Sequence, residues 1–520
     1  MVSQKPKIVI IGAGIAGLTA AKKLYTTQNT NELFEVCVVE GGNRIGGRIF
    51  TTEFCGDRVE MGATWIHGIE GNPIYKIAQE INGFETDKPW DSMGGKVDKK
   101  LTITEEGHEV HSSFVNSISN FFNNLLEFSS GEGDFDGGVG RKIVESLNLE
   151  ENGRVDKISM GSYLRKGLDT EKDGENVEVF ENWSRKALEE GIFAMFENIH
   201  RHYSSAGDLG TLDFNGESEY CNFPGDEITI AKGYSSIVES LASVLPPGLI
   251  QLGRKVSKIE WQLETSDGNK PVKLHFSDGS VMYADHVIVT VSLGVLKQGI
   301  REDSSLFSPP LPKFKTEAIS RLGFGVVDKV FLQLTPTHHD GMNFPNMMMV
   351  FHQSNAKLKN PKIPLWIRRT TLTHPVYPES RVVVSWFAGE EALKVETLDD
   401  DEIIEGVSIT MSEFLSNTKH YKNSIKFSKV LKCKWGTDPL FLGSYTHIAV
   451  GSSGDDLDAM AEPLPKEISD DKNSKKSPRL QVLFAGEATS RNYYSTTHGA
   501  YLTGLREANR LLEYFQCVDV

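Results

Sequence analysis

Hydrophobic runs near the start of the chain predict a strand–helix–strand unit. Residues 7–11 form a continuous apolar run, which is typical of a buried parallel strand. Glycines follow, then an alanine- and leucine-rich stretch from about Ile15 to Tyr25 that predicts a helix, and then a second apolar run over residues 34–40. This order predicts a βαβ unit, and therefore an α/β fold built on a parallel sheet.

Later patterns are more varied. The runs at 273–276 and 281–283 flank Ser277-Asp278-Gly279-Ser280 and predict a hairpin. Further strands are expected over 329–334, 381–387 and 480–484, and helices over 177–201 and 499–515. Residues 129–173 have weak periodicity and predict surface excursions with short helices, whereas residues 455–479 are highly charged and predict a flexible loop.

Length and charge narrow the class of protein. A single core stops growing near about 250–300 residues, so 520 residues predict several domains or one interleaved body. The 55 basic and 71 acidic residues give a net charge of −16, which argues against a general nucleic-acid binder and permits a cationic partner.

The five cysteines are scattered and have no metal-ligand spacing, so we expect no metal site, no disulfide framework and a reducing compartment. No run of about 18 apolar residues predicts a membrane span. The N-terminal residues do not resemble a signal peptide, and the last three are not a peroxisomal address. A cytoplasmic location is therefore expected.

The first glycine cluster is Gly12-Ala13-Gly14-Ile15-Ala16-Gly17. Gly12 permits a tight turn, Gly14 allows close approach of a pyrophosphate, and Gly17 allows helix and strand to pack closely. The phosphates would lie on the first amides of the helix, at Ile15 and Ala16. Glu40 closes the second strand, where a carboxylate can bind ribose hydroxyls and repel a 2′-phosphate, which favours FAD or NAD over NADP. The alternative is a glycine turn without a ligand.

Two further segments resemble one known cofactor site. Arg44-Ile45-Gly46-Gly47-Arg48, directly after Glu40, and Leu483-Phe484-Ala485-Gly486-Glu487-Ala488-Thr489 resemble two halves of the site in glutathione-reductase-type FAD proteins of the flavin amine oxidase family. The resemblance implies that Gly47, Arg48 and Glu487 lie near the pyrophosphate and ribityl groups of FAD. Because the halves are more than 400 residues apart, it implies a discontinuous, Rossmann-like FAD-binding domain (1–85, 225–308 and 440–520) with an inserted α+β substrate domain (86–224 and 309–439).

Three more segments, 60–68, 325–332 and 486–500, resemble the polyamine oxidases of that family, namely the cytosolic plant enzymes and the animal spermine and acetylpolyamine oxidases. The resemblance implies that Lys329 holds a water against flavin N5 and that His67 lines the substrate tunnel. It also implies a set of residues close to FAD, from adenine to flavin: Val256, Met61, Gly62, Ala63, Thr64, Trp65, Thr496 and Thr497. Without these neighbouring motifs, Lys329 would be interpreted as an ordinary lysine at the edge of a strand, and His67 as a surface or hydrogen-bonded histidine with a structural role.

The implied reaction is oxidation of a secondary amine of spermine or thermospermine, with hydride transfer to flavin N5. Hydrolysis of the imine gives spermidine and 3-aminopropanal, and the reduced flavin passes electrons to O2, forming H2O2, or to another acceptor. FAD is expected to be noncovalent, because the region where related monoamine oxidases carry a tethering cysteine has none.

The reacting nitrogen must be neutral, which calls for an aromatic, apolar throat. Trp65, Tyr493 and Tyr494 are the candidates for its walls. The distal ammonium groups need acids, for which Glu197 and Asp208 are the candidates.

Two other interpretations of the function stay open. A lysine-specific histone demethylase shares the chemistry, although the chain lacks the long helical insertion of those enzymes. A non-catalytic carrier resembling the Rab GDP-dissociation inhibitors shares the fold, but Glu40, Arg48 and Glu487 argue against it. The order of preference among polyamines, the electron acceptor and the oligomeric state are not determined by the sequence.

Overall fold

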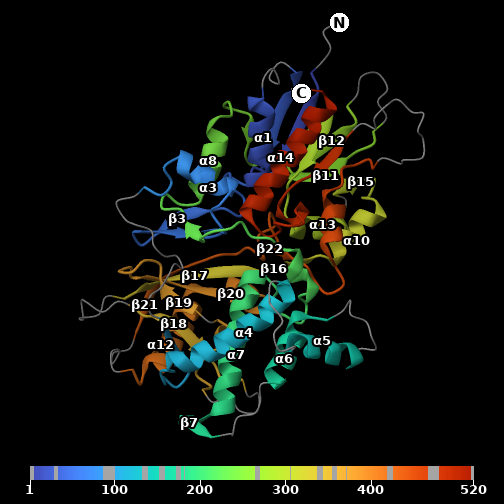
Figure 1. Cartoon of the computed structure of the whole chain (residues 1–520). Coiled ribbons are helices and arrows are strands. Elements are labelled where there is room, and N and C mark those ends of the chain that lie inside the picture. Colours follow the sequence, from blue (N-terminus) through green and yellow to red (C-terminus); the bar gives the residue numbers. More distant parts are fainter. Residues whose placement is uncertain are drawn as a thin grey trace.

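The computed structural model shows two main sheets, one above the other (Figure 1). It describes residues 5–27, 33–85, 100–131, 139–150, 158–170, 177–180, 182–263, 270–304, 306–335, 344–353, 360–370, 372–418, 425–466 and 480–516. Both ends of the drawn chain lie at the top of the view, next to the first sheet.

The first sheet is parallel and is assembled from distant parts of the chain. Its strands lie in the order β10 (Ile250–Gln251), β2 (Glu35–Val39), β1 (Lys7–Ile11), β14 (His286–Val289) and β23 (Val482–Phe484). Helices α1 (Ile15–Thr26), α3 (Pro73–Glu80), α8 (Ser235–Ser243) and α14 (Thr497–Tyr514) share one hydrophobic core with this sheet. The α/β class and the opening βαβ unit are therefore confirmed.

The other face of this sheet packs against a smaller sheet in the order β13 (Val281–Ala284), β12 (Val272–Phe276), β11 (Val256–Glu260) and β15 (Phe307–Ser308). Antiparallel pairing of β12 with β13 confirms the predicted hairpin. Helices α9 (Leu293–Gly299), α10 (Lys313–Arg321) and α13 (Gly454–Ala461) complete this layer.

The second main sheet has six strands in the order β21 (Phe427–Lys432), β17 (Val327–Leu334), β20 (Val382–Ala388), β19 (Leu372–Pro375), β18 (Asn346–Val350) and β6 (Lys100–Thr104). Side chains alternate between the faces of a strand. One face packs on α11 (Glu390–Thr397) and α12 (Asp400–Leu415), through residues such as Val330 and Leu332. The other face, which carries Lys329 and Trp386, turns toward the cavity described below.

A helical layer lies beside the second sheet (Figure 1). It contains α4 (Ser112–Ser130), α5 (Val139–Glu150), α6 (Met160–Thr170), α7 (Arg185–Ser204) and the 3-10 turn η2 (Asn215–Glu219). Ile143 of α5 and Tyr163 of α6 are buried in its core. The segment predicted as surface excursions therefore contributes part of the core within its described residues.

Short elements connect these layers. They are the pairs β3 (Thr51–Phe54) with β4 (Asp57–Glu60), β5 (Trp65–Ile66) with β9 (Ile228–Thr229), β7 (Glu178–Phe180) with β8 (Trp183–Ser184), and β16 (Gly323–Gly325) with β22 (Tyr445–His447), and the turns η4 (Leu365–Ile367) and η5 (Glu487–Thr489). No helix within the described ranges is long and apolar enough to cross a membrane.

Two predictions need correction. The helix expected over 177–201 begins at Arg185, because the side chain of Ser184 accepts a hydrogen bond from the amide of Ala187 and caps it, while residues 178–184 form the β7–β8 hairpin. The flexible loop expected over 455–479 is wrong in its first part. A capping box between Ser453 and Asp456 starts α13 there, and residues 467–479 lie outside the described part. The domain boundaries stay a prediction.

Candidate active site

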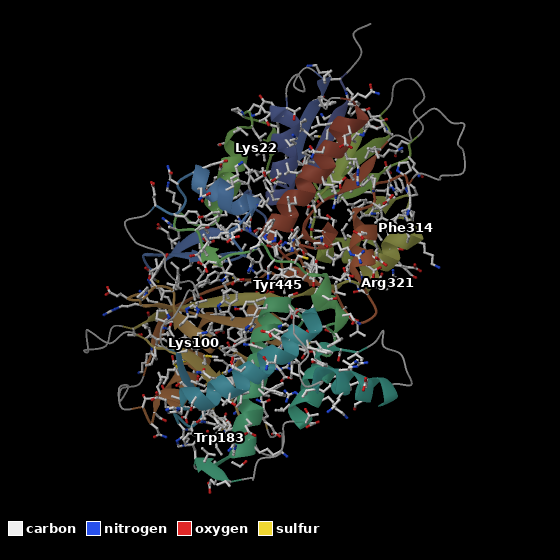
Figure 2. The ribbon with its side chains drawn as sticks, viewed as in Figure 1. Lys22, Lys100, Trp183, Phe314, Arg321 and Tyr445 are labelled. Atoms are coloured by element: carbon white, nitrogen blue, oxygen red, sulfur yellow. The ribbon has the colours of Figure 1, made fainter. Side chains whose placement is uncertain are left out.

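A cavity of about 1110 Å³ lies where the two main sheets meet. From the first sheet it receives the carboxyl ends of β1, β2 and β14, with Ile11, Glu40 and Val289. From the second sheet it receives the cavity-facing side around Lys329, and Tyr445 of β22 lies between the two sheets (Figure 2). Ligands of open α/β sheets bind at the carboxyl ends of the strands, so this is the expected place for a nucleotide.

Glycines shape the end of the cavity next to the first sheet. Gly14 precedes α1 without a side-chain cap, and an added Cβ would meet only the carbonyl oxygen of Gly46, at 4.0 Å. A Cβ on Gly486 would meet no protein atom within 4 Å. Both glycines line the cavity, as do Gly12, Ile15, Ala16 and Gly47. The backbone is therefore bare where a pyrophosphate would approach the positive end of α1.

Gly17 has a different position from the other predicted glycines. It does not line the cavity, and a Cβ there would lie 2.0 Å from the carbonyl oxygen of Gly12. Only glycine fits at this crossing of helix and turn. Its contribution to the cofactor site is therefore the shape of the turn.

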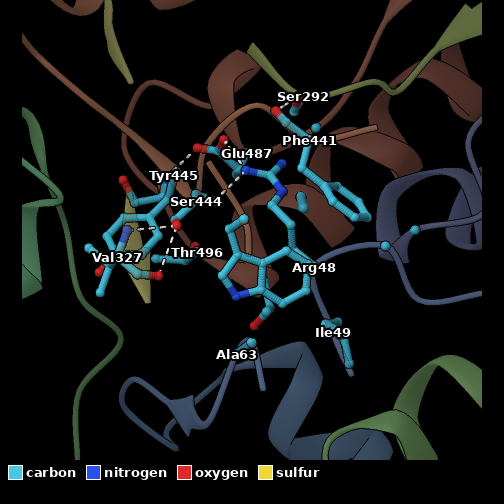
Figure 3. A pocket seen from close by; sticks show the side chains of 18 of the residues that line it. Arg48, Ile49, Ala63, Ser292, Val327, Phe441, Ser444, Tyr445, Glu487 and Thr496 are labelled. Atoms are coloured by element: carbon cyan, nitrogen blue, oxygen red, sulfur yellow. Dashed lines mark hydrogen bonds and ion pairs between the residues drawn. The ribbon is translucent and has the colours of Figure 1, made fainter. Parts of the chain in front are cut away.

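Three predicted charged residues hold the walls of this end together. Glu40 accepts hydrogen bonds from the amides of Ala13 and Gly42, both at 2.7 Å, which fixes the two glycine turns beside each other. Figure 3 shows Arg48 between Glu487 and Ser444. Its Nη1 donates to the Ser444 carbonyl at 2.7 Å and to Glu487 Oε1 at 3.0 Å. Glu487 also accepts from the amide of Ser495, at 3.0 Å.

A second helix begins at the same cavity. The side chain of Thr496 caps α14 by accepting from the amide of Gly499 at 2.9 Å, and Thr497 contacts the hydroxyl of Tyr234. Thr496 and Thr497 line the cavity, and so does Val256 of β11. The N-termini of α1 and α14 therefore both face one space, which suits a ligand with negative charge at two places.

Lys329 lies in the middle of the cavity wall and is 2 % exposed. Its Nζ donates to the carbonyl oxygens of Glu60 (2.7 Å) and Gly62 (2.6 Å) and to Thr64 Oγ1 (2.6 Å). These bonds hold the segment Met61-Gly62-Ala63-Thr64-Trp65 along the cavity, and all five of its residues line it. Three acceptors use every hydrogen of an ammonium, so the water implied by the resemblance can bind Nζ of the ammonium only by displacing one of them.

Besides its three polar acceptors, Lys329 contacts an aromatic ring. Nζ lies 4.5 Å from the ring centre of Trp386, and burial lowers the pKa of the ammonium. Trp65, Tyr494 and Trp435 also line the cavity, and Trp435 Nε1 donates to the carbonyl of Met61 at 3.1 Å. Trp386 and Trp435 were not predicted. Burial and the charge of Lys329 itself disfavour a second positive charge beside it.

Besides Glu40 and Glu487, the cavity carries acids that differ from the predicted substrate anchors. Glu217 of η2, Asp226 and Glu227 line it. His67, which lines it as well, bonds through Nδ1 to Glu227 Oε1 at 2.7 Å, and this bond lowers the pKa of Glu227. The antiparallel pairing of β5 with β9 brings these two segments together. The result is a region that can bind cations.

The structure places three predicted substrate contacts outside the cavity lining. Glu197 is buried in α7 and pairs with Arg165, and burial raises its pKa to about 7. Asp208 is exposed and accepts from the amide of Gly210 at 2.8 Å. Tyr493 stacks on Phe223 with ring centres 5.0 Å apart. The side chains of Glu197, Asp208 and Tyr493 are thus engaged with neighbouring parts of the protein. Glu217, Asp226 and Glu227, which line the cavity, therefore replace Glu197 and Asp208 as candidate anchors.

The residues present fit FAD. The uncapped start of α1 and the bare glycines would hold its pyrophosphate, Glu40 would hold a ribose, and the segment 61–65 would lie against the flavin. The described residues that line the cavity include no cysteine, so none of them offers a thiol for covalent attachment.

Comparisons with known proteins agree with this geometry. The family model for flavin-containing amine oxidoreductases matches residues 15–512. The chain is 51 % identical to "Probable polyamine oxidase 5" of Arabidopsis thaliana and 41 % identical to "Polyamine oxidase 1" of Oryza sativa subsp. japonica, each over 99 % of both chains. It is 30 % identical to the human "Peroxisomal N(1)-acetyl-spermine/spermidine oxidase", over 98 % of this chain and 95 % of that protein.

Proposed function

Since the chain belongs to the family of flavin-containing amine oxidoreductases, and is thus an FAD-dependent oxidoreductase, we propose that it oxidises spermine or thermospermine at a secondary amine. One observation carries the proposal. A single cavity joins a dinucleotide cradle, an aromatic wall around Lys329 and a set of carboxylates, as an oxidase of polycations requires. Polyamine oxidases among the relatives support the substrate class.

The residues around Lys329 favour the neutral form of the reacting nitrogen. An alkyl amine has a pKa near about 10 and is mostly charged at neutral pH. Burial of this part of the cavity and the positive charge of Lys329 both disfavour a second ammonium nearby. The lone pair of the nitrogen is then free to assist loss of hydride from the adjacent carbon.

The carboxylates have the opposite effect on the other nitrogens. Glu217, Asp226 and Glu227 stabilise ammonium groups, so a substrate with several amines can be charged at one end and neutral at the other. Bound FAD supplies the acceptor of the electron pair and is reoxidised by O2, giving H2O2, or by another acceptor. Water hydrolyses the released imine, and the proposed products are spermidine and 3-aminopropanal.

We further propose that FAD is noncovalent and that the protein is cytoplasmic. The absence of cysteine among the described lining residues supports the first proposal. The second is supported by the cysteines at 37, 55, 221 and 433, which are free. Release of FAD by acid precipitation tests the first, and imaging of an internally tagged protein tests the second.

The central experiment is anaerobic titration of the purified yellow protein with spermine, thermospermine, spermidine and N1-acetylspermine. We expect the flavin bands near about 380 and 450 nm, a general property of oxidised flavin, to bleach with at least one of these amines. Product identification and reoxidation in air complete the cycle. A colourless protein that FAD does not reconstitute would favour the carrier, and a yellow protein that no polyamine bleaches would exclude polyamine oxidation.

A further inference from the structure

His374 lies on the cavity-facing side of the second main sheet and has no assigned role. In the register of this sheet, Lys329 of β17 pairs with Trp386 of β20, and His374 of β19 pairs with Val384 of β20. Trp386 and Val384 are two residues apart, so they share a face, and His374 lies on the same face as Lys329. It lines the cavity and is 2 % exposed.

The hydrogen bond at one ring nitrogen fixes the proton on the imidazole. His374 Nδ1 lies 2.9 Å from the carbonyl oxygen of Pro375. A carbonyl oxygen can only accept, so Nδ1 carries the hydrogen and Nε2 of the neutral ring carries a lone pair. Burial, together with the charges of Lys100 and Lys329, lowers the pKa of His374 to about 4 in spite of the hydrogen bond to Pro375, so the ring is neutral at physiological pH.

The second ring nitrogen, Nε2, is buried and has no hydrogen-bond partner among the residues that the structure describes. A buried acceptor without a donor is unfavourable, so we expect a donor to meet it in the working protein. Since Nδ1 is bonded to the backbone of β19, Nε2 is the ring nitrogen that can still accept from a donor on the cavity side.

We propose that His374 Nε2 accepts a hydrogen bond from an N–H group of the bound amine, close to Lys329. The proposal rests on the function proposed above, and it adds a substrate-contacting residue that acts differently from the acids. A carboxylate stabilises an ammonium through its charge, whereas a neutral imidazole accepts a hydrogen bond without adding negative charge. His374 is therefore suited to hold an amine near the aromatic wall, where a charged nitrogen is disfavoured.

Three substitutions at one position separate the hydrogen bond from the shape of the ring. H374N keeps a donor near the Nδ1 position and removes the acceptor at the ε position. H374Q places an amide oxygen near the Nε2 position, and H374F keeps a ring without either group. T373V is the matched control, because Thr373 lies on the same strand but points to the opposite face, where it contacts Ser385 Oγ at 2.7 Å.

The measurement is anaerobic bleaching of the flavin at varied spermine concentration, with the FAD content and Tm of each variant determined first. We expect H374N and H374F to raise the dissociation constant of spermine at least about tenfold, as for loss of a hydrogen bond to a charged or polar N–H. H374Q should recover most of this loss, and T373V should match the wild type. Wild-type affinity in H374N would overturn the proposal and assign Nε2 to an ordered water.

A second probe separates this proposal from the proposed function. 1,12-Diaminododecane has no secondary amine, and its binding can be followed through the shift of the flavin spectrum without turnover. If no polyamine bleaches the wild type but the diamine binds tenfold more weakly to H374N, the amine contact stands and the oxidation of polyamines fails. If spermine bleaches all variants with equal dissociation constants, only the role of His374 fails.

Discussion

Lys329 combines two tasks in one side chain, because its Nζ both faces the cavity and holds residues 60–64 in place. We expect K329M to retain FAD, since the residues that would hold its pyrophosphate and ribose form no hydrogen bond with Lys329, and to slow flavin reduction or reoxidation by about tenfold or more. Rapid-mixing spectroscopy of each half-reaction measures this. Wild-type rates in both half-reactions would contradict the role of Lys329, and K313M, at an exposed lysine, is the control.

The acids of the cavity provide a second prediction at single residues. E217Q and E227Q should each raise the dissociation constant of spermine about three- to tenfold, because each removes one partly screened charge, and added salt should reduce the difference. E197Q should leave the constant unchanged, because Glu197 pairs with Arg165 away from the cavity. An effect of E197Q equal to that of E217Q would restore the anchor predicted from the sequence. Concentration-dependent bleaching measures all three.

Asp328, which neighbours Lys329 on the opposite face of the sheet, predicts a pH dependence of stability. Burial and the carboxylate of Glu396 raise the pKa of Asp328 in the folded protein. Between about pH 4, where an unfolded Asp ionises, and that raised pKa, the folded state binds an extra proton, so stability falls as pH rises. D328N removes this loss, and its Tm relative to the wild type should rise from pH 5.5 to pH 8.5.

The control for that experiment is D278N, at an exposed carboxyl whose pKa is lowered by hydrogen bonds from Ser280. Asp278 stays ionised across the same interval, so the Tm of D278N relative to the wild type should not change with pH. A constant difference between D328N and the wild type would show that Asp328 does not carry the extra proton.

At the scale of elements, α10 and α13 are joined by one buried lysine. Lys315 Nζ donates to the carbonyl oxygens of Ala459 and Met460, both at 2.9 Å, and Glu462, at 2.7 Å, at the end of α13. K315M would leave these carbonyls unsatisfied, so we expect a loss of about 2–3 kcal/mol in the free energy of unfolding. Chemical denaturation measures it, and K313M, which is exposed on the same helix, should change little.

The elements also show what the sequence can predict. The β1–α1–β2 unit and the β12–β13 hairpin follow from local patterns and turn residues, and they were predicted to within a few residues. The cation-binding region could not be predicted, because Glu227 meets His67 only through the β5–β9 pairing, across 160 residues. His374 has no motif around it, and its place depends on the register of the six-stranded sheet. Local elements follow from neighbouring residues, whereas the cavity wall that would contact the substrate forms only when strands far apart in the sequence pair.

At the scale of the whole molecule, both main sheets contribute residues to the cavity. Removal of FAD should therefore make both sheets less rigid. We expect the apoprotein to have a lower Tm and faster hydrogen exchange in the segments that line the cavity, at 14–16, 61–65 and 494–497, and in β17 around Lys329. Helix α12, on the far side of the second sheet, should exchange at an unchanged rate. Exchange measured by mass spectrometry tests this, and a loss of protection confined to the first sheet would contradict the shared cavity.

The link between Arg48 and Glu487 has a consequence for how the protein is made. A ribosome releases the chain from its N-terminus onward, so the first glycine turns emerge while the partners that complete their walls have not yet been synthesised. Gly486, Glu487 and the capped start of α14 come late in the chain, with Glu487 439 residues after Arg48. The complete cradle for the cofactor therefore cannot form until that part of the chain has been synthesised. A ribosome stalled well before that point should carry a nascent chain that does not retain FAD.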